Sequence, residues 1–133
     1  RMLVWLCREQ EHHGHLSTVP VGGWRPGVAK HRHDQQPIEA AATADACATA
    51  AAVTGDDAWD APLFQAIAWF LGDNDGGFVM YDPLTGGCYD GLTVDGPNLN
   101  QGAESTLALV ATLQHARAWA ARRGATRPSG GLA

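Results

Sequence analysis

Residues Tyr81 to Val110 read YDPLTGGCYDGLTVDGPNLNQGAESTLALV and change in character from a loop to a helix. Most of this stretch is rich in glycine, acids and amides, which are residues that form turns and loops. Its last residues instead carry apolar side chains at helical spacing. We therefore predict a long polar loop, followed by a helix that begins at Gly102 or Ala103, ends near Arg123 and is buried on both flanks.

A similar unit lies earlier in the chain, where EHHGHLSTVPVGGWRPGVAKHRHDQQ precedes a predicted helix from Pro37 to Gly55. Proline suits the first position of a helix, and glycine suits the residue that follows its end. Both loops also end in Gln-x-x-Glu, at Gln36 to Glu39 and at Gln101 to Glu104. This weak internal repeat of a loop and a helix predicts that the two loops lie on one side of the molecule.

The remaining segments complete a mostly helical pattern. A helix capped by Asp56 or Asp57 and ending at Gly72 pairs with the preceding helix as an αα-hairpin. The apolar segment from Met2 to Cys7 reads as the tail of another helix, and Phe78 to Leu92 as a small β-hairpin. We predict an all-α fold of αα-hairpins with long loops, in one domain over residues 1–123, followed by a disordered tail over 124–133.

Composition narrows the class of protein. A chain of 133 residues, 45% hydrophobic, can build one core. Its formal charge is −5 and its basic residues are scattered, so we expect no nucleic-acid partner. No apolar run approaches the roughly 20 residues that span a bilayer, so we expect no membrane partner and a cytoplasmic location. The three cysteines show no CxxC spacing, which disfavours a disulfide framework or a thiolate zinc site.

The two loops carry the residues that we expect to bind a ligand. A helix N-terminus offers free N–H groups and a positive dipole end. Amides and carboxylates gathered there can bind sugar hydroxyls, while aromatic rings cover the apolar faces of a sugar. The candidate binding residues are His15, Trp24, His33, Asp34, Gln35, Gln36, Tyr81, Asp82, Tyr89, Asn98, Asn100 and Gln101.

Three carboxylates are candidates for catalysis: Asp90, Glu104 and Glu39. Hydrolysis of a glycosidic bond needs one carboxylic acid as proton donor and one carboxylate as base or nucleophile. Each of these carboxylates, and Asp82 as well, could instead have a purely structural role. Glu39 and Glu104 stand where a glutamate reaches back to cap its helix, and Asp82 and Asp90 stand where an aspartate forms a turn.

Histidines cluster in the first loop, in HHGH and HRHD. Possible zinc ligands by type are His12, His13, His15, His31, His33 and Asp34, but their spacing matches no tight zinc motif. We therefore predict no metal site and no cofactor. His15 and His33 are better candidates for substrate binding or acid–base chemistry.

Five segments together resemble a known family: GHLSTVPVGGW, HDQQPIEAA, WFLGDNDGG, YDPLTGGCYDGL and DGPNLNQGAESTLAL. They resemble the C-terminal part of an (α/α)6 toroid, the six-hairpin glycosidase-like module, as attached to the C-terminus of bacterial family-four glycosyltransferases. The likeness covers about Gly14 to Trp119. It implies inner helices beginning at Pro37 and Gly102, whose preceding loops line a carbohydrate-facing funnel, and an outer helix from Asp57 to Leu71.

The resemblance also implies partners. This chain is shorter than a complete ring, so the expected partners are a carbohydrate ligand and the upstream portion of the same toroid or a glycosyltransferase domain. Such a fragment would expose helix flanks and self-associate. The predicted function is a carbohydrate-active domain that binds or processes a glycoside. The alternatives are a non-catalytic glycan-binding or structural module, and a sugar epimerase-like domain.

Overall fold

The computed structural model describes residues 1–125, and it is mostly helical with two small antiparallel sheets. The predicted disordered tail lies outside the described residues apart from Gly124 and Ala125, which close the last helix. The elements are α1 (Met2–Gln10), β1 (Glu11–His12), β2 (His15–Leu16), α2 (Pro37–Thr54), the 3-10 helix η1 (Asp57–Trp59), α3 (Asp60–Phe70), β3 (Gly91–Thr93), β4 (Gly96–Asn98) and α4 (Ala103–Ala125).

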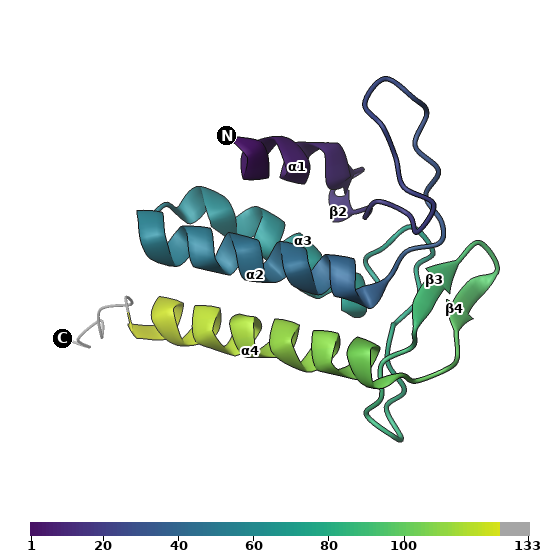
Figure 1. Cartoon of the computed structure of the whole chain (residues 1–133). Coiled ribbons are helices and arrows are strands. Elements are labelled where there is room, and N and C mark those ends of the chain that lie inside the picture. Colours follow the sequence, from purple (N-terminus) through teal and green to yellow (C-terminus); the bar gives the residue numbers. More distant parts are fainter. Residues whose placement is uncertain (126–133) are drawn as a thin grey trace.

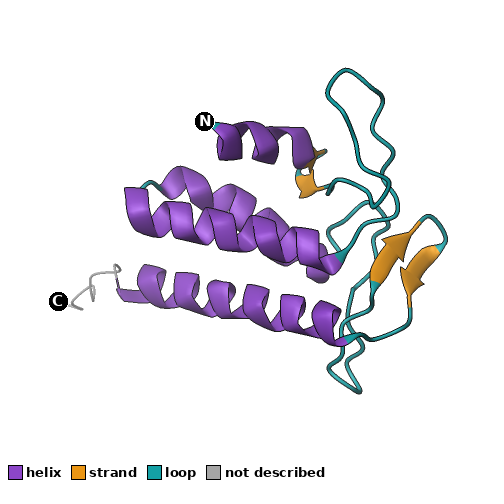
Figure 2. Cartoon of the chain, in the orientation of Figure 1, coloured by secondary structure: helices purple, strands orange, loops and turns teal. Residues whose placement is uncertain are grey.

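The helices alternate in direction (Figure 1). α2 and α4 run the same way, and both begin at the end of the molecule where the loops and β3–β4 lie. α1 and α3 run the opposite way, so α2 and α3 form the predicted αα-hairpin. Figure 2 shows that nearly all the loop lies at this one end, which we call the loop end. The predicted placement of both long loops on one side is therefore confirmed.

Helix α2 is the centre of the packing because its small side chains let neighbouring helices approach closely. Ala40, Ala44 and Cys47 are fully buried along it, and α2 packs against α3, α4 and α1. The helix begins at Pro37 as predicted, and its end is set by Gly55, which adopts a left-handed φ of 66°. Glycine reaches this conformation without a steric penalty, so its N–H can bond the carbonyl of Ala51 at 2.9 Å.

The predicted β-hairpin over Phe78 to Leu92 is present only in minimal form, as an antiparallel bridge between Tyr81 and Cys88. The longer hairpin, β3–β4, begins at the end of that segment and was not predicted. A two-residue turn at Val94 and Asp95 joins β3 to β4, and Gly96, which follows it and pairs with Thr93, has a φ of 123° that glycine adopts readily. The β1–β2 hairpin inside the first loop was not predicted at all.

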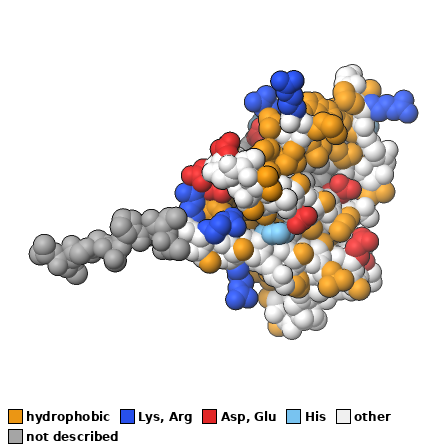
Figure 3. Space-filling view, turned by 60° about the vertical axis from the view of Figure 1, so that its left-hand side comes forward, with side chains coloured by type: hydrophobic (Ala, Val, Ile, Leu, Met, Phe, Trp, Pro, Cys, Tyr) orange, Lys and Arg blue, Asp and Glu red, His pale blue; other side chains and the backbone are white. Residues whose placement is uncertain are grey.

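Helix α4 was predicted to be buried on both flanks, and this is wrong for the described chain. Ser105, Ala108 and Thr112 are buried on the side that packs against α2. Leu107 is 67% exposed and Leu113 is 40% exposed, because no other described element covers that side. Hydrophobic side chains also reach the surface over much of the face drawn in Figure 3.

A helix that crosses a membrane must be both long and apolar. Over residues 1–125, no helix has both the length and the apolar character needed to cross a membrane.

Candidate functional site

Gln35 joins the two loops. Its backbone N–H donates to the carbonyl of Leu92 at 3.0 Å, and the N–H of Leu92 donates back at 2.9 Å. Its side chain is fully buried, where Nε2 donates to the carbonyl of Arg32 at 2.8 Å and to the carboxylate of Asp75. Its Oε1 accepts from Trp69 Nε1 at 2.7 Å. Gln35 was predicted to bind a ligand, and the structure places it inside the molecule as the link between the loops.

This pairing fixes which side chains face outward. Residues opposite each other in an antiparallel pair share a face, and consecutive residues alternate. Gln35 and Leu92 face the core, so the register puts Gln36 opposite Gly91 on the other face, and Gly91 itself pairs with Asn98. Gln36 and Asn98 are both exposed. Two amide side chains thus flank Gly91, which carries no side chain of its own.

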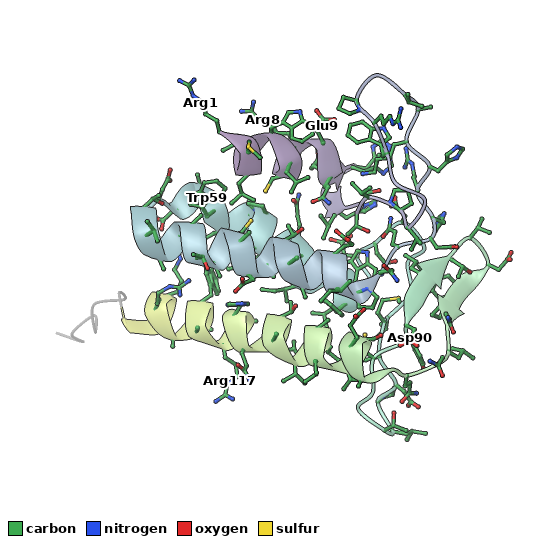
Figure 4. The ribbon with its side chains drawn as sticks, viewed as in Figure 1. Arg1, Arg8, Glu9, Trp59, Asp90 and Arg117 are labelled. Atoms are coloured by element: carbon green, nitrogen blue, oxygen red, sulfur yellow. The ribbon has the colours of Figure 1, made fainter. Side chains whose placement is uncertain are left out.

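Asp90 ties the second loop to the first turn of α4 (Figure 4). One carboxylate oxygen accepts from the N–H of Gly102 at 2.7 Å and from the hydroxyl of Ser105, and the other accepts from the amide of Asn100. The hydrogen bonds from Ser105, Asn100 and Gly102 hold the pKa of Asp90 below its usual range. Asp90 is therefore an ionised carboxylate at neutral pH.

Asp82 is held in a similar way a few residues earlier. Its carboxylate accepts from the N–H of Leu84 at 2.8 Å and from Gln101 Nε2 at 3.2 Å, while Thr85 donates its hydroxyl to Gln101 at 2.7 Å. The Leu84 N–H is the main reason that the pKa of Asp82 lies below its ordinary value. The turn role considered for Asp82 is observed, and Gln101 is part of the same turn.

Glu39 and Glu104 are both exposed on the first turns of α2 and α4. Within residues 1–125 neither carboxylate forms a hydrogen bond or an ion pair, so the capping role considered for them is not observed. The structure does not join either glutamate to Asp90. The three candidate catalytic carboxylates share one end of the molecule without forming a bonded group.

The other candidate residues are spread over the loop end. Trp24 donates its indole N–H to the carbonyl of Val28, inside its own loop. Tyr81 and Tyr89 are half-buried and pack against the core. His33 is half-buried, and the neighbouring Asp34 is exposed.

A group that sequence reasoning missed centres on Asp75. The Asp75 side chain is 3% exposed, and its Oδ1 lies 3.0 Å from His15 Nε2 and 3.4 Å from His12 Nδ1. Arg32 Nη1 lies 3.7 Å from the same oxygen and 2.6 Å from His12 Nδ1. His12 lies in β1 and His15 lies in β2, whereas Asp75 follows α3.

The charges in this group are set by its surroundings. Burial alone would raise the pKa of Asp75, but hydrogen bonds from Ser17, His15 and Gln35 together bring it below the ordinary value. Partial desolvation and the nearby Arg32 lower the pKa of His12. The group therefore combines an ionised carboxylate with a neutral imidazole at neutral pH.

Asp75 was not predicted to be a site residue, because Asn-Asp-Gly-Gly is typical of an ordinary turn. A turn is present, and Asn74 holds it by accepting from the N–H of Gly76 and donating to the carbonyls of Trp69 and Phe78. The clustering of histidines in the first loop was the one sign of this group in the sequence. The acidic partner of those histidines lies in another segment, and the sequence alone does not identify it.

A surface pocket of about 340 Å³ lies elsewhere, between α1 and α3. It is mostly apolar and is lined in part by Cys7, Trp59 and Gln65. Arg8, from α1, also lines it, and Figure 4 shows Arg8 and Trp59 far from Asp90 at the loop end. None of the predicted site residues lines this pocket.

No protein-family model matches this chain, and no curated protein matches it significantly.

Proposed function

We propose that this chain is a carbohydrate-active domain of the six-hairpin class, and that its loop end binds a glycan. One observation carries the proposal: the strand register presents the exposed amides of Gln36 and Asn98 on either side of Gly91. A carboxamide offers both donors and acceptors, as recognition of a sugar's hydroxyl groups requires. Further exposed polar residues at the same end are Asp34, Asn100 and Gln101.

The direction of the helices supports the ring architecture. In an (α/α)6 toroid, inner helices run parallel to each other and antiparallel to the outer helices. α2 and α4 fit the inner role, and α1 and α3 fit the outer role (Figure 1). The remaining helices of a ring, or a glycosyltransferase domain, would cover the exposed Leu107 and Leu113 of α4.

Asp90 limits the chemistry that the site can perform. A carboxylate whose oxygens accept from Ser105, Asn100 and Gly102, with a lowered pKa, suits a base or nucleophile and cannot serve as proton donor at neutral pH. If the domain hydrolyses glycosides, the acid is Glu39 or Glu104, since both are exposed at the same end. Glycan binding itself does not depend on this assignment.

Calorimetric titration with a panel of mono- and oligosaccharides tests the binding. We expect Gln36→Ala and Asn98→Ala each to weaken the binding of the best ligand by about tenfold, the loss of one net hydrogen bond. Gln114→Ala is the matched control, because Gln114 is an exposed glutamine halfway along α4. Absence of binding by any saccharide, or equal weakening by all three substitutions, would contradict the proposal.

A second measurement separates an enzyme from a binding module. In an enzyme, Asp90→Asn and one of the two substitutions Glu39→Gln and Glu104→Gln abolish turnover of the bound glycoside and leave its dissociation constant nearly unchanged. In a binding module, no turnover is found in the unsubstituted chain.

A further inference from the structure

We propose that His12, His15 and Asp75 form a binding site for a divalent transition-metal ion, with Zn²⁺ the best match. Two imidazoles and one carboxylate are ligands that zinc uses in proteins, with a remaining position for water. The three candidate ligand atoms all lie within 4.8 Å of one another. We call this group the His–His–Asp site.

The separations fit zinc coordination. With bonds of about 2.0–2.1 Å, two ligand atoms of a tetrahedral zinc lie roughly 3.3 Å apart. Oδ1 of Asp75 lies 3.0 Å from His15 Nε2 and 3.4 Å from His12 Nδ1. The two imidazole nitrogens lie within 4.8 Å of each other, so rotation of the histidine side chains toward each other would let one ion bind all three atoms.

The carboxylate is already oriented by a neighbour. Gln35 Nε2 donates to Oδ2 of Asp75, which leaves Oδ1 turned toward the two histidines. Gln35 is in turn fixed by the indole N–H of Trp69 at 2.7 Å. Ligands in metal sites are commonly held by such a second layer of hydrogen bonds. The orientation of Asp75 is therefore built into the core and does not depend on a mobile surface group.

Two cations face this site, and both can yield to a metal. Arg32 lies 2.6 Å from His12 Nδ1, but its side chain is 47% exposed and can swing into water. Lys30 is bound elsewhere, because its ammonium group donates to the carbonyls of Ser17 and Glu9. Arg32 thus competes with the metal for the same lone pair, and its removal should tighten metal binding.

Binding would connect segments that are far apart in the chain. The histidines belong to the β1–β2 hairpin and Asp75 to the turn after α3, so the ion would clamp the first loop to the second beside Gln35. The metal would stabilise the loop end whether or not a glycan binds there. This inference does not rest on the proposed function.

The test is titration of the whole chain with Zn²⁺ by calorimetry and with Co²⁺ by visible absorption, which reports coordination geometry directly. We expect one ion per chain. His12→Ala and His15→Ala should each weaken binding by about tenfold or more. His13→Ala is the control, since His13 neighbours His12 and is exposed outside the site.

Arg32→Ala keeps all three ligands and is expected to bind zinc more tightly than the unsubstituted chain. Circular dichroism confirms that each variant is folded. The inference is overturned if the unsubstituted chain shows no saturable binding, if His13→Ala weakens binding as much as His15→Ala, or if Arg32→Ala weakens it. The last outcome would mean that the group is an ion-pair network only. No saccharide is present, so this result is independent of the glycan titration.

Discussion

Gln35 and Gln36 are adjacent residues of the same type with opposite environments. Gln35 is fully buried and makes hydrogen bonds to Arg32, Asp75 and Trp69. Gln36 is exposed and forms no side-chain hydrogen bond with its helix. The alternation follows from extended backbone at this point, where consecutive side chains point to opposite faces. Gln35 thus stabilises the fold, whereas its neighbour Gln36 is free to take part in the proposed glycan binding.

We predict that Gln35→Leu destabilises the fold by about 3 kcal/mol, because it removes one hydrogen bond from the buried Asp75 carboxylate and leaves the Trp69 indole N–H buried without a partner. The nearly equal volume of leucine keeps the loss of packing small. Gln36→Leu should change the free energy of unfolding by less than about 0.5 kcal/mol. Urea unfolding followed by tryptophan fluorescence measures both, and equal effects would show that Gln35 is not the link described.

Cys7 and Cys47 meet between α1 and α2, with their sulfur atoms 3.7 Å apart. The hydrogen bond from Cys47 lowers the pKa of Cys7 to about 7, while Cys47 is fully buried. Burial raises the pKa of Cys88 to about 12. We predict that iodoacetamide labels Cys7 first, at a rate that rises through about pH 7. Mass spectrometry of digested protein identifies the labelled residue; labelling of Cys88 first would contradict the structure.

At the scale of elements, the helices were largely predictable because their signals are local. Pro37 and Gly55 mark the ends of α2, and apolar spacing marks α3 and α4. The β3–β4 hairpin was not predicted, because several Gly-rich turns compete in one segment and the prediction followed the earlier turn, between Tyr81 and Cys88. The His–His–Asp site was missed because His15 and Asp75 stand 60 positions apart, and only packing of the hairpin against α3 brings them together.

Asp90 couples the second loop to α4 in a pH-dependent way. Its pKa is lowered in the folded state, so its stabilising effect is present above the unfolded-state pKa of about 3.9 and is lost as pH falls through the lower, folded-state value. We predict that Asp90→Asn lowers the urea midpoint at pH 7, and that the difference from the unsubstituted chain shrinks below about pH 4.

Asp95→Asn is the control for this series, because Asp95 is an exposed aspartate in the β3–β4 turn. Its urea midpoint should follow that of the unsubstituted chain at every pH. A constant difference between Asp90→Asn and the unsubstituted chain from pH 7 to pH 3 would show that the Asp90 hydrogen bonds do not depend on its charge.

At the scale of the whole molecule, the exposed apolar residues of α4 matter most. Leu107 is 67% exposed, Val110 44% and Leu113 40%. Three such residues on one helix, spaced three apart, form a stripe suited to another helix. In the proposed ring this stripe meets the next inner helix, and without that neighbour it is free to meet a second copy.

We therefore predict that the chain self-associates, and that Leu107→Gln with Leu113→Gln reduces the association because it makes the stripe polar. Light scattering over a range of protein concentrations measures the mass. The pair Leu84→Gln and Val94→Gln is the control, since both residues are exposed in loops at the other end of the molecule. A monomer at every concentration would contradict the ring proposal.

Glycan binding at the loop end can be located by titrating the ¹⁵N-labelled chain with the saccharide that binds best. We expect the largest changes in amide chemical shift to cluster at Gln36, Gly91 and Asn98. Changes centred instead on Cys7 and Gln65, in the apolar pocket between α1 and α3, would contradict it, as would the absence of any change.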